Sequence, residues 1–206
     1  MGRHTQEAPP DMSMTAPADT ANTGDVVDLL IEQHMTIRDL FLQVSASTGD
    51  ARREAFHELV RMLAVHETAE EQLVHPLARI SVHGGGDVVD DRLAEEHDAK
   101  QTLAALEQMG PDAAEFDNLL AKFRTDVLQH AHNEETYEFR YLRANVPAAQ
   151  LRALVPMVTA AEAVAPTHPH PGLESATANT LTGPALSLFD RVKDLARSAL
   201  GDKRQE

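Results

Sequence analysis

Two copies of the pattern His-x-x-x-Glu constrain the fold of this chain more than any other feature of its sequence. They lie 64 residues apart, as His66 with Glu70 and His130 with Glu134. Each copy falls on a stripe of apolar residues that recurs every three or four positions, the spacing of a helix face that packs into a core. A carboxylate buried there without a compensating charge costs several kcal/mol or becomes protonated. The pattern therefore predicts helices that enclose a charged group in their common core.

The apolar stripes predict four consecutive amphipathic helices with short connections. The expected ranges are about 25–44, 50–77, 87–109 and 112–141, with N-caps at Asp25, Asp50 and Asp87 and a capping box at Asp112 and Glu115. Pro76 should kink or end the second helix. A shorter fifth helix follows Pro147 and ends before Pro166. The sequence predicts an all-α fold, an antiparallel up-down four-helix bundle with additional C-terminal helices.

Segments of different composition flank this bundle. Residues 1–24 are rich in Pro and Thr and lack apolar periodicity, which predicts a disordered N-terminal arm. The predicted bundle spans 25–144, the additional helix 145–165, and an irregular tail 166–206 with a short amphipathic helix over about 185–200. In that helix Leu188, Phe189, Val192 and Leu195 form an apolar side able to dock on another surface.

Composition restricts the classes of function. The chain has no Cys, so any metal must bind through His or carboxylate side chains, and disulfides and thiol nucleophiles are excluded. The formal net charge of −15 and the lack of a basic stripe argue against a nucleic-acid partner. No apolar run is long enough for a signal peptide or a membrane span, so we expect a soluble, cytoplasmic protein with no membrane partner.

Six polar residues occupy the apolar stripes at repeated spacing. They are His34, His66, Glu70, His97, His130 and Glu134, and the two halves of the set are 63 or 64 residues apart. Residues four apart share one face of a helix, so each His-x-x-x-Glu pair can present a nitrogen and a carboxylate to the same place. A single core His is more often satisfied by a neighbouring side chain than by a metal. The repeated set favours two metal ions with two imidazoles each, bridged by Glu70 and Glu134; the alternative is a polar network that fixes helix register.

The remaining candidates do not share this pattern. His57, His75 and His132 lie off the stripes, and we expect them to be solvated. Glu71 and Glu135 follow the predicted bridges by one residue, which turns them about 100° away, so they should be exposed or should support the ligands. Tyr137 either packs in the core or approaches the metals.

At this point the sequence resembles the hemerythrin-like family of His-His-Glu cation-binding domains. The resemblance covers about residues 26–143 and rests on His34, the stretch His66-Glu-Thr-Ala-Glu70-Glu71, the pair Glu96-His97, and His130-Ala-His-Asn-Glu134-Glu135. It implies a non-haem, carboxylate-bridged di-iron centre, with an oxo or hydroxo bridge, that meets hydrogen peroxide, dioxygen or nitric oxide. The site is similar to the symmetric four-His, two-Glu type of actinobacterial hemerythrin-like proteins.

One departure from the oxygen carriers of that family bears on activity. They have a further His one turn after the third-helix ligand, where this chain has Gln101. The resemblance therefore implies a di-iron protein that reacts with peroxide in a catalase-like manner, or with nitric oxide, in a stress response. Gln101 and Tyr137 are candidates for hydrogen-bonding a bound ligand. The alternatives are a module that binds or senses oxygen or iron without turnover, and a protein that donates iron. Any protein partner is unknown.

Overall fold

The computed structural model describes residues 24–163, and every regular element in that range is helical. The elements are α1 (Val26–Ala46), α2 (Gly49–Ala69), η1 (Glu70–Val74), α3 (His75–Ser81), α4 (Gly85–Met109), α5 (Phe116–Glu134), η2 (Glu135–Phe139), α6 (Arg140–Asn145) and α7 (Ala148–Glu162), where η marks a π-helical turn. The all-α fold class predicted from the apolar stripes is confirmed.

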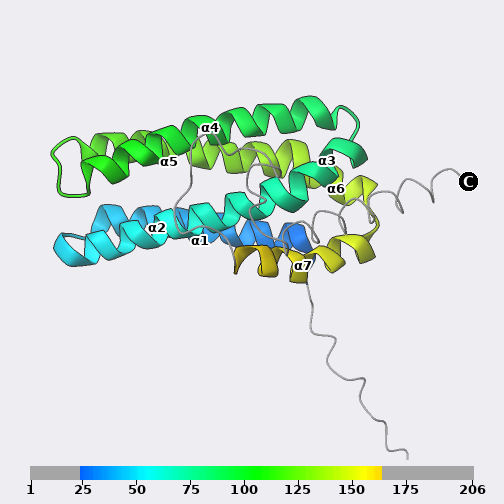
Figure 1. Ribbon diagram of the computed structural model, residues 1–206, viewed down its shortest axis with the longest axis horizontal. Coiled ribbons are helices and arrows are strands. Elements are labelled where there is room, and N and C mark those ends of the chain that lie inside the picture. Colours follow the sequence, from blue (N-terminus) through cyan, green and yellow to red (C-terminus); the bar gives the residue numbers. More distant parts are fainter. Residues whose placement is uncertain (1–23, 164–206) are drawn as a thin grey trace, which may run out of the picture.

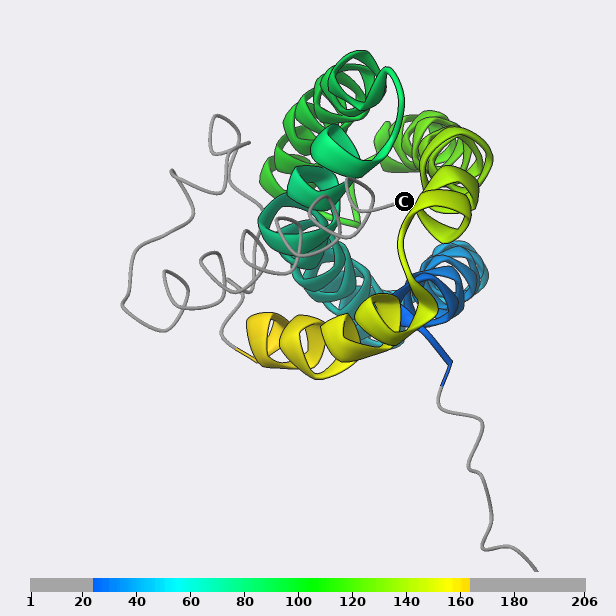
Figure 2. The same cartoon turned by 90° about the vertical axis from the view of Figure 1, so that its right-hand side faces the viewer.

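The helices form four long rods. Two of them are the single helices α1 and α4, while α2 continues through η1 into α3, and α5 through η2 into α6, without leaving helical backbone geometry. Consecutive rods run antiparallel along the long axis of the molecule (Figure 1), and the end view shows them arranged around one centre (Figure 2). The additional helix predicted after Pro147 is α7, which packs across the outside of α1 and α2.

Most helix ends follow from local chemistry. Asp25 caps α1, with its Oδ1 accepting from the N–H groups of Val27 and Asp28 at 2.9 and 3.1 Å, and Asp28 completes a capping box. Gly110 ends α4 at a φ of 77°, a conformation that favours glycine.

Three predicted starts differ from the structure. α2 begins at Gly49, after Thr48, which makes no capping hydrogen bond. α4 begins at Gly85, two residues before the predicted cap Asp87, because Gly84 supplies the left-handed turn that starts the helix. α5 begins only at Phe116, since the segment from Pro111 to Glu115 forms turns in place of a capped helical start.

Two apolar clusters fill the bundle on either side of a polar layer. One cluster contains Leu30, Leu73, Phe139 and α7 residues such as Leu154; the other contains Ile37, Phe41, Leu63, Leu103 and Phe123. Along α1, His34 lies between Leu30 of the first cluster and Ile37 of the second. Burying each such aliphatic or aromatic side chain stabilises the fold by about 1.5–3 kcal/mol. The two clusters thereby fix the level at which the four rods bring their polar side chains together.

Some sequence predictions concern residues that lie outside the described range. These are the disordered arm, apart from Gly24, and the tail over 166–206 with its short amphipathic helix. Among the described helices, none is both long enough and apolar enough to cross a membrane.

Candidate metal centre

The imidazoles of His34 and His66 converge at the middle of the bundle. Their Nε2 atoms are 3.1 Å apart, and the two side chains are 6% and 4% exposed. Each Nδ1 has an outer partner, Glu135 Oε1 at 2.9 Å for His34 and Gln33 Oε1 at 2.8 Å for His66. An acceptor at Nδ1 leaves Nε2 as the metal-binding nitrogen of each ring, and in this structure the two Nε2 atoms share a hydrogen bond. Both rings therefore direct a ligand atom to one point.

Glu70 and Glu134 bring their carboxylates to the same place. Both side chains are completely buried, and their four oxygens take part in no hydrogen bond. Glu70 Oε2 lies 3.2 Å from Nε2 of His66, and Glu134 Oε2 lies 3.2 Å from Nε2 of His34, but neither contact has hydrogen-bond geometry. One ligand atom from each of these four residues lies within 4.8 Å of all the others. Carboxylates buried without donors are suited to bind cations.

Electrostatics within this group follow from its burial. Burial and the neighbouring charge of Glu134 raise the pKa of Glu70 well above its usual value. Burial would also raise the pKa of Glu134, but the charge of His130 outweighs it and holds that pKa well below the usual range. Burial, with the nearby His34, lowers the pKa of His66 well below that of a free imidazole. The opposite shifts of the two carboxylates follow from their shared burial, which disfavours a second negative charge at the same place.

A π-helical turn begins at Glu70, and another begins directly after Glu134. Glu70 is the first residue of η1, and Glu134 is the residue before η2. The N–H of His75 donates to the carbonyl of Glu70, five residues earlier. In an α-helix, five residues would turn His75 about 140° away from Glu70, whereas a π turn holds more residues and returns the fifth to the same side. His75 is 2% exposed, so the prediction that it is solvated is wrong.

His75 belongs to a second group of four ligand atoms that all lie within 4.8 Å of one another. The group consists of Glu70, His75, Glu96 and Glu134, and it shares both glutamates with the first group. Nε2 of His75 is 2.7 Å from Oε1 of Glu96, and its Nδ1 is 2.9 Å from Oε1 of the buried Glu138. Burial would lower the pKa of His75, but the charges of Glu138 and Glu96 outweigh burial and hold it well above its usual value.

His130 lies at the edge of the second group. Its Nε2 is 3.3 Å from Oε1 of Glu134 and takes part in no hydrogen bond, while its Nδ1 is 2.9 Å from Oε2 of Glu95. Burial would lower the pKa of His130, but the charge of Glu134 outweighs it and raises the pKa well above the usual value. The ring repeats the arrangement of His34 and His66, with an outer acceptor on Nδ1 and Nε2 turned inward.

The structure does not bring His97 into either group. The buried face of α4 is formed by Val89, Arg92, Glu96, Lys100, Leu103 and Leu106, one position from the stripe predicted through His97. His97 is only partly buried, and its Nε2 is 2.6 Å from Nε2 of the exposed Gln101. Glu96 therefore occupies the place predicted for His97. The apolar pattern of the sequence placed the buried face of α4 one position away, because the face that is buried in the structure carries three charged residues. A search for apolar stripes rejects such a face.

Neither residue predicted to hydrogen-bond a ligand lies among the metal-binding groups. Gln101 is exposed beside His97, and Tyr137 is 53% exposed on η2. The residues of η2 that turn inward are instead Glu138 and Phe139, and both are buried. Phe139 stacks on the ring of His34, with ring centroids 5.7 Å apart.

The charges on the inner face of α4 compensate one another. Nζ of Lys100, 4% exposed, pairs with Glu71 and lies 3.5 Å from Oε2 of Glu67 and 3.7 Å from Oε2 of Glu96. Burial would lower the pKa of Lys100, but these three carboxylates outweigh it and raise the pKa. Glu71 is thus a buried partner of Lys100, while Glu135 supports His34 from a position that is 40% exposed.

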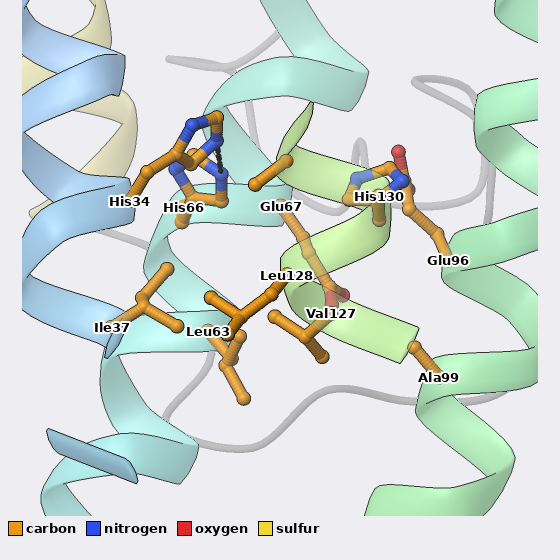
Figure 3. A pocket seen from close by; sticks show the side chains of 11 residues that line it. His34, Ile37, Leu63, His66, Glu67, Glu96, Ala99, Val127, Leu128 and His130 are labelled. Carbon is orange, nitrogen blue, oxygen red and sulfur yellow. Dashed lines mark hydrogen bonds between the residues drawn. The ribbon is translucent and has the colours of Figure 1, made fainter. Parts of the chain in front are cut away.

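A cavity of about 20 Å³ lies beside the imidazoles, enough for one molecule of about the size of water or a diatomic gas. Figure 3 shows the imidazoles of His34, His66 and His130 above the aliphatic residues, and the side chain of Glu67 reaches down beside Val127. The polar lining consists of His34, His66, His130, Glu67 and Glu96, and the aliphatic lining of Ile37, Leu63, Ala99, Val127, Leu128 and Ala131. Glu67, which the sequence did not single out, has a pKa raised to about 7 by burial.

The donor set fits a pair of transition-metal ions. Imidazole nitrogens with carboxylate oxygens are the usual ligands of non-haem iron, and they also accept zinc. The main support for this fit is that the oxygens of Glu70 and Glu134 have no hydrogen-bond partner although both side chains are completely buried. Bound cations would supply the partners that these oxygens lack. This buried cluster of histidines and glutamates is a metal-binding site.

Comparison with known proteins agrees with this description. Residues 25–142 match the family described as Hemerythrin HHE cation binding domain. A curated protein of Nostoc sp., named DNA nickase, is 26% identical over 127 residues; the match covers 61% of this chain and 36% of that protein, so the chain spans well under half of its length. The solved structure of a hemerythrin HHE cation-binding domain-containing protein from Mycobacterium kansasii aligns with a TM-score of 0.60 and 18% identity, covering 81% of this chain and 98% of that one.

Proposed function

The chain belongs to the family of hemerythrin HHE cation-binding domains, and we propose that its buried cluster holds two iron ions bridged by Glu70 and Glu134. The observation that carries the proposal is the sharing of these two glutamates between two groups of ligand atoms. The first ion would be held by His34 and His66 together with the bridges. The second would be held by His75 and Glu96 together with the bridges, and Nε2 of His130 lies close enough to join them.

We propose further that this centre consumes hydrogen peroxide, or a related small oxidant such as nitric oxide. The bound iron pair would supply redox chemistry and Lewis acidity. The cavity beside the imidazoles admits only a small molecule, and its aliphatic side excludes bulk water. Glu67 places a carboxylate in the cavity wall, where it can accept or return a proton as the substrate reacts. An oxygen carrier has no need of such a group, and this favours turnover over reversible binding.

An oxygen-binding or oxygen- or iron-sensing module without turnover is the alternative. The same cavity would suit dioxygen as well as peroxide, so size alone does not separate the two functions. A protein that donates iron is less favoured, because four imidazoles that are each held at Nδ1 by an outer acceptor bind a metal more firmly than a site made mainly of carboxylates.

The test is made on protein purified from cells grown with adequate iron. Metal analysis should give two iron ions per chain, and an oxygen electrode should record oxygen evolution over many turnovers after peroxide is added. A stable oxygenated spectrum that reverses when oxygen is removed, with no peroxide turnover, would replace the enzyme with the binding module. An iron content near one would count against the paired site.

A nucleic-acid substrate is not part of the proposal. The name DNA nickase belongs to a protein of which this chain matches 36%, and the formal charge of −15 disfavours approach to a phosphate backbone.

A further inference from the structure

A second hollow adjoins the metal-site cavity from outside. It is a cleft of about 280 Å³ between α4 and α5, lined by Glu95, Asp98 and Thr102 of α4 and by Lys122, Asp126 and Gln129 of α5. At its inner end lie Ala99 and His130, and these two residues also line the cavity beside the imidazoles. We infer that this cleft is the route by which small molecules reach the cavity, and that the small side chain of Ala99 keeps the route open. The inference rests on the proposed iron pair only because its test measures the binding of nitric oxide to that iron.

His130 forms one side of the boundary between cleft and cavity. Its Nδ1 is bound to Glu95, which lines the cleft, whereas its Nε2 faces Glu134 in the site. Glu95 is itself held, since its Oε1 accepts from Nδ2 of Asn133 at 2.8 Å and from a guanidinium nitrogen of Arg92 at 2.8 Å. This side of the boundary is therefore a ring held at Nδ1 by Glu95, with its Nε2 3.3 Å from Oε1 of Glu134. A molecule that passes from cleft to cavity must pass on the other side, over Ala99.

The helix α1 supplies a control position away from the cleft. Thr36 of α1 lines neither the cleft nor the cavity. Thr36 is exposed, and its hydroxyl donates to the carbonyl of Glu32 within its own helix. A change at Thr36 therefore alters an exposed helix position without narrowing the boundary between cleft and cavity.

The charge of the cleft indicates what passes through it. The carboxylates of Glu95, Asp98 and Asp126 outnumber the cationic groups, since Nζ of Lys122 is bound to Asp126 at 2.6 Å and the ring of His130 to Glu95 at 2.9 Å. An acidic lining repels anions and leaves neutral molecules unaffected. The route is thus suited to small uncharged molecules such as hydrogen peroxide, dioxygen and nitric oxide, and nitric oxide is the probe chosen for the test.

The test uses the absence of cysteine from the chain. In Ala99→Cys a side chain of similar size carries the only thiol of the chain. After iron loading, this thiol is labelled with methyl methanethiosulfonate in one sample and with the larger benzyl methanethiosulfonate in another. The rate of nitric oxide binding to the reduced, iron-loaded protein is measured by stopped flow before labelling, after labelling, and after the label is removed by reductant and desalting. Thr36→Cys, labelled in the same way, is the control.

The methyl label should slow nitric oxide binding, the benzyl label should slow it at least about tenfold, and removal should restore the rate. The control should keep its rate throughout. An unchanged rate at complete labelling of Ala99→Cys, an equal slowing of the control, or loss of iron on labelling would overturn the inference. Failure of the proposed function is a separate result, since a protein that evolves no oxygen from peroxide can still show this gating of nitric oxide.

Discussion

Glu70 and His75 place ligand atoms within 4.8 Å of each other, although they are five positions apart in the sequence, because the turn between them is π-helical. The second half of the chain repeats this feature, since η2 follows Glu134 and turns Glu138 and Phe139 inward. Glu138 then holds Nδ1 of His75, and Phe139 stacks on His34. Each π turn therefore adds to the site a side chain that regular α-helical spacing would direct elsewhere.

His75→Ala should lower the iron content, while His97→Ala should leave it near that of the unchanged protein. His75 belongs to a group of ligand atoms, and His97 lies partly exposed outside both groups. Metal analysis of the two purified variants, with circular dichroism to check folding, makes the comparison. If His97→Ala loses iron and His75→Ala keeps it, the face of α4 assigned to the core is wrong by one residue.

Glu70→Ala and Glu134→Ala should each lose both metals, because each glutamate serves both groups of ligand atoms. Glu135→Ala is the matched control: Glu135 supports only His34 from the surface side, so its loss should weaken iron binding without abolishing it, by a factor of about 10–100. Iron content after extensive desalting measures the difference. Equal loss in all three variants would argue against Glu70 and Glu134 as bridges.

The sequence was sufficient for the fold because apolar stripes and helix breakers are local signals. The stripes predicted the helical bundle, and the N-cap at Asp25 predicted where α1 begins. Four residues of the predicted ligand set, His34, His66, Glu70 and Glu134, lie in the first group of ligand atoms, since residues four apart keep α-helical register up to each glutamate.

The second group could not be predicted, because it depends on two features without a local signal. The π turn changes the register after Glu70, so His75 looked like a surface residue. The inner face of α4 is charged, and only tertiary pairing of Lys100 with Glu71 makes that burial possible. A search for buried ion pairs across helices, with Glu71 opposite Lys100, is the signal that would have moved the α4 register from His97 to Glu96.

Iron uptake by the metal-free protein should become stronger as pH rises through the neutral range. The pKa values of Glu70, His75 and His130 are raised, so these groups carry protons near neutrality that the metal must displace. Release of protons on binding means that the affinity increases with pH. Calorimetric titration with ferrous ion in two buffers of different ionisation enthalpy counts the protons. Binding that is independent of pH between about 6 and 8 would contradict the protonated state proposed for the free site.

Removing residues 1–22 should leave iron content and the peroxide reaction unchanged. Every ligand of the two groups lies in the part that remains, and so does Asp25, which caps α1 and binds Arg143 of α6. The truncated and full-length proteins are compared by metal analysis and by the oxygen electrode. Loss of iron in the truncated protein would show that the arm contributes to the bundle.

Lys100→Met should destabilise the metal-free protein more than any change of a surface lysine. Nζ of Lys100 is buried among Glu67, Glu71 and Glu96, and removing one partner of a buried ion pair costs about 3–5 kcal/mol because the remaining charges lose their compensation. Lys122→Met is the control, since Lys122 pairs with Asp126 at the surface, where such a pair contributes about 0–1 kcal/mol.

Urea unfolding of the metal-free proteins gives both free energies. The double variant Lys100→Met with Glu71→Gln should recover part of the loss, because it removes the carboxylate that pairs most closely with Lys100. Equal, small effects of Lys100→Met and Lys122→Met would mean that Lys100 reaches solvent in solution. In that case Glu71 and Glu96 would not be held by a buried cation, and the inner face of α4 would have to be reassigned.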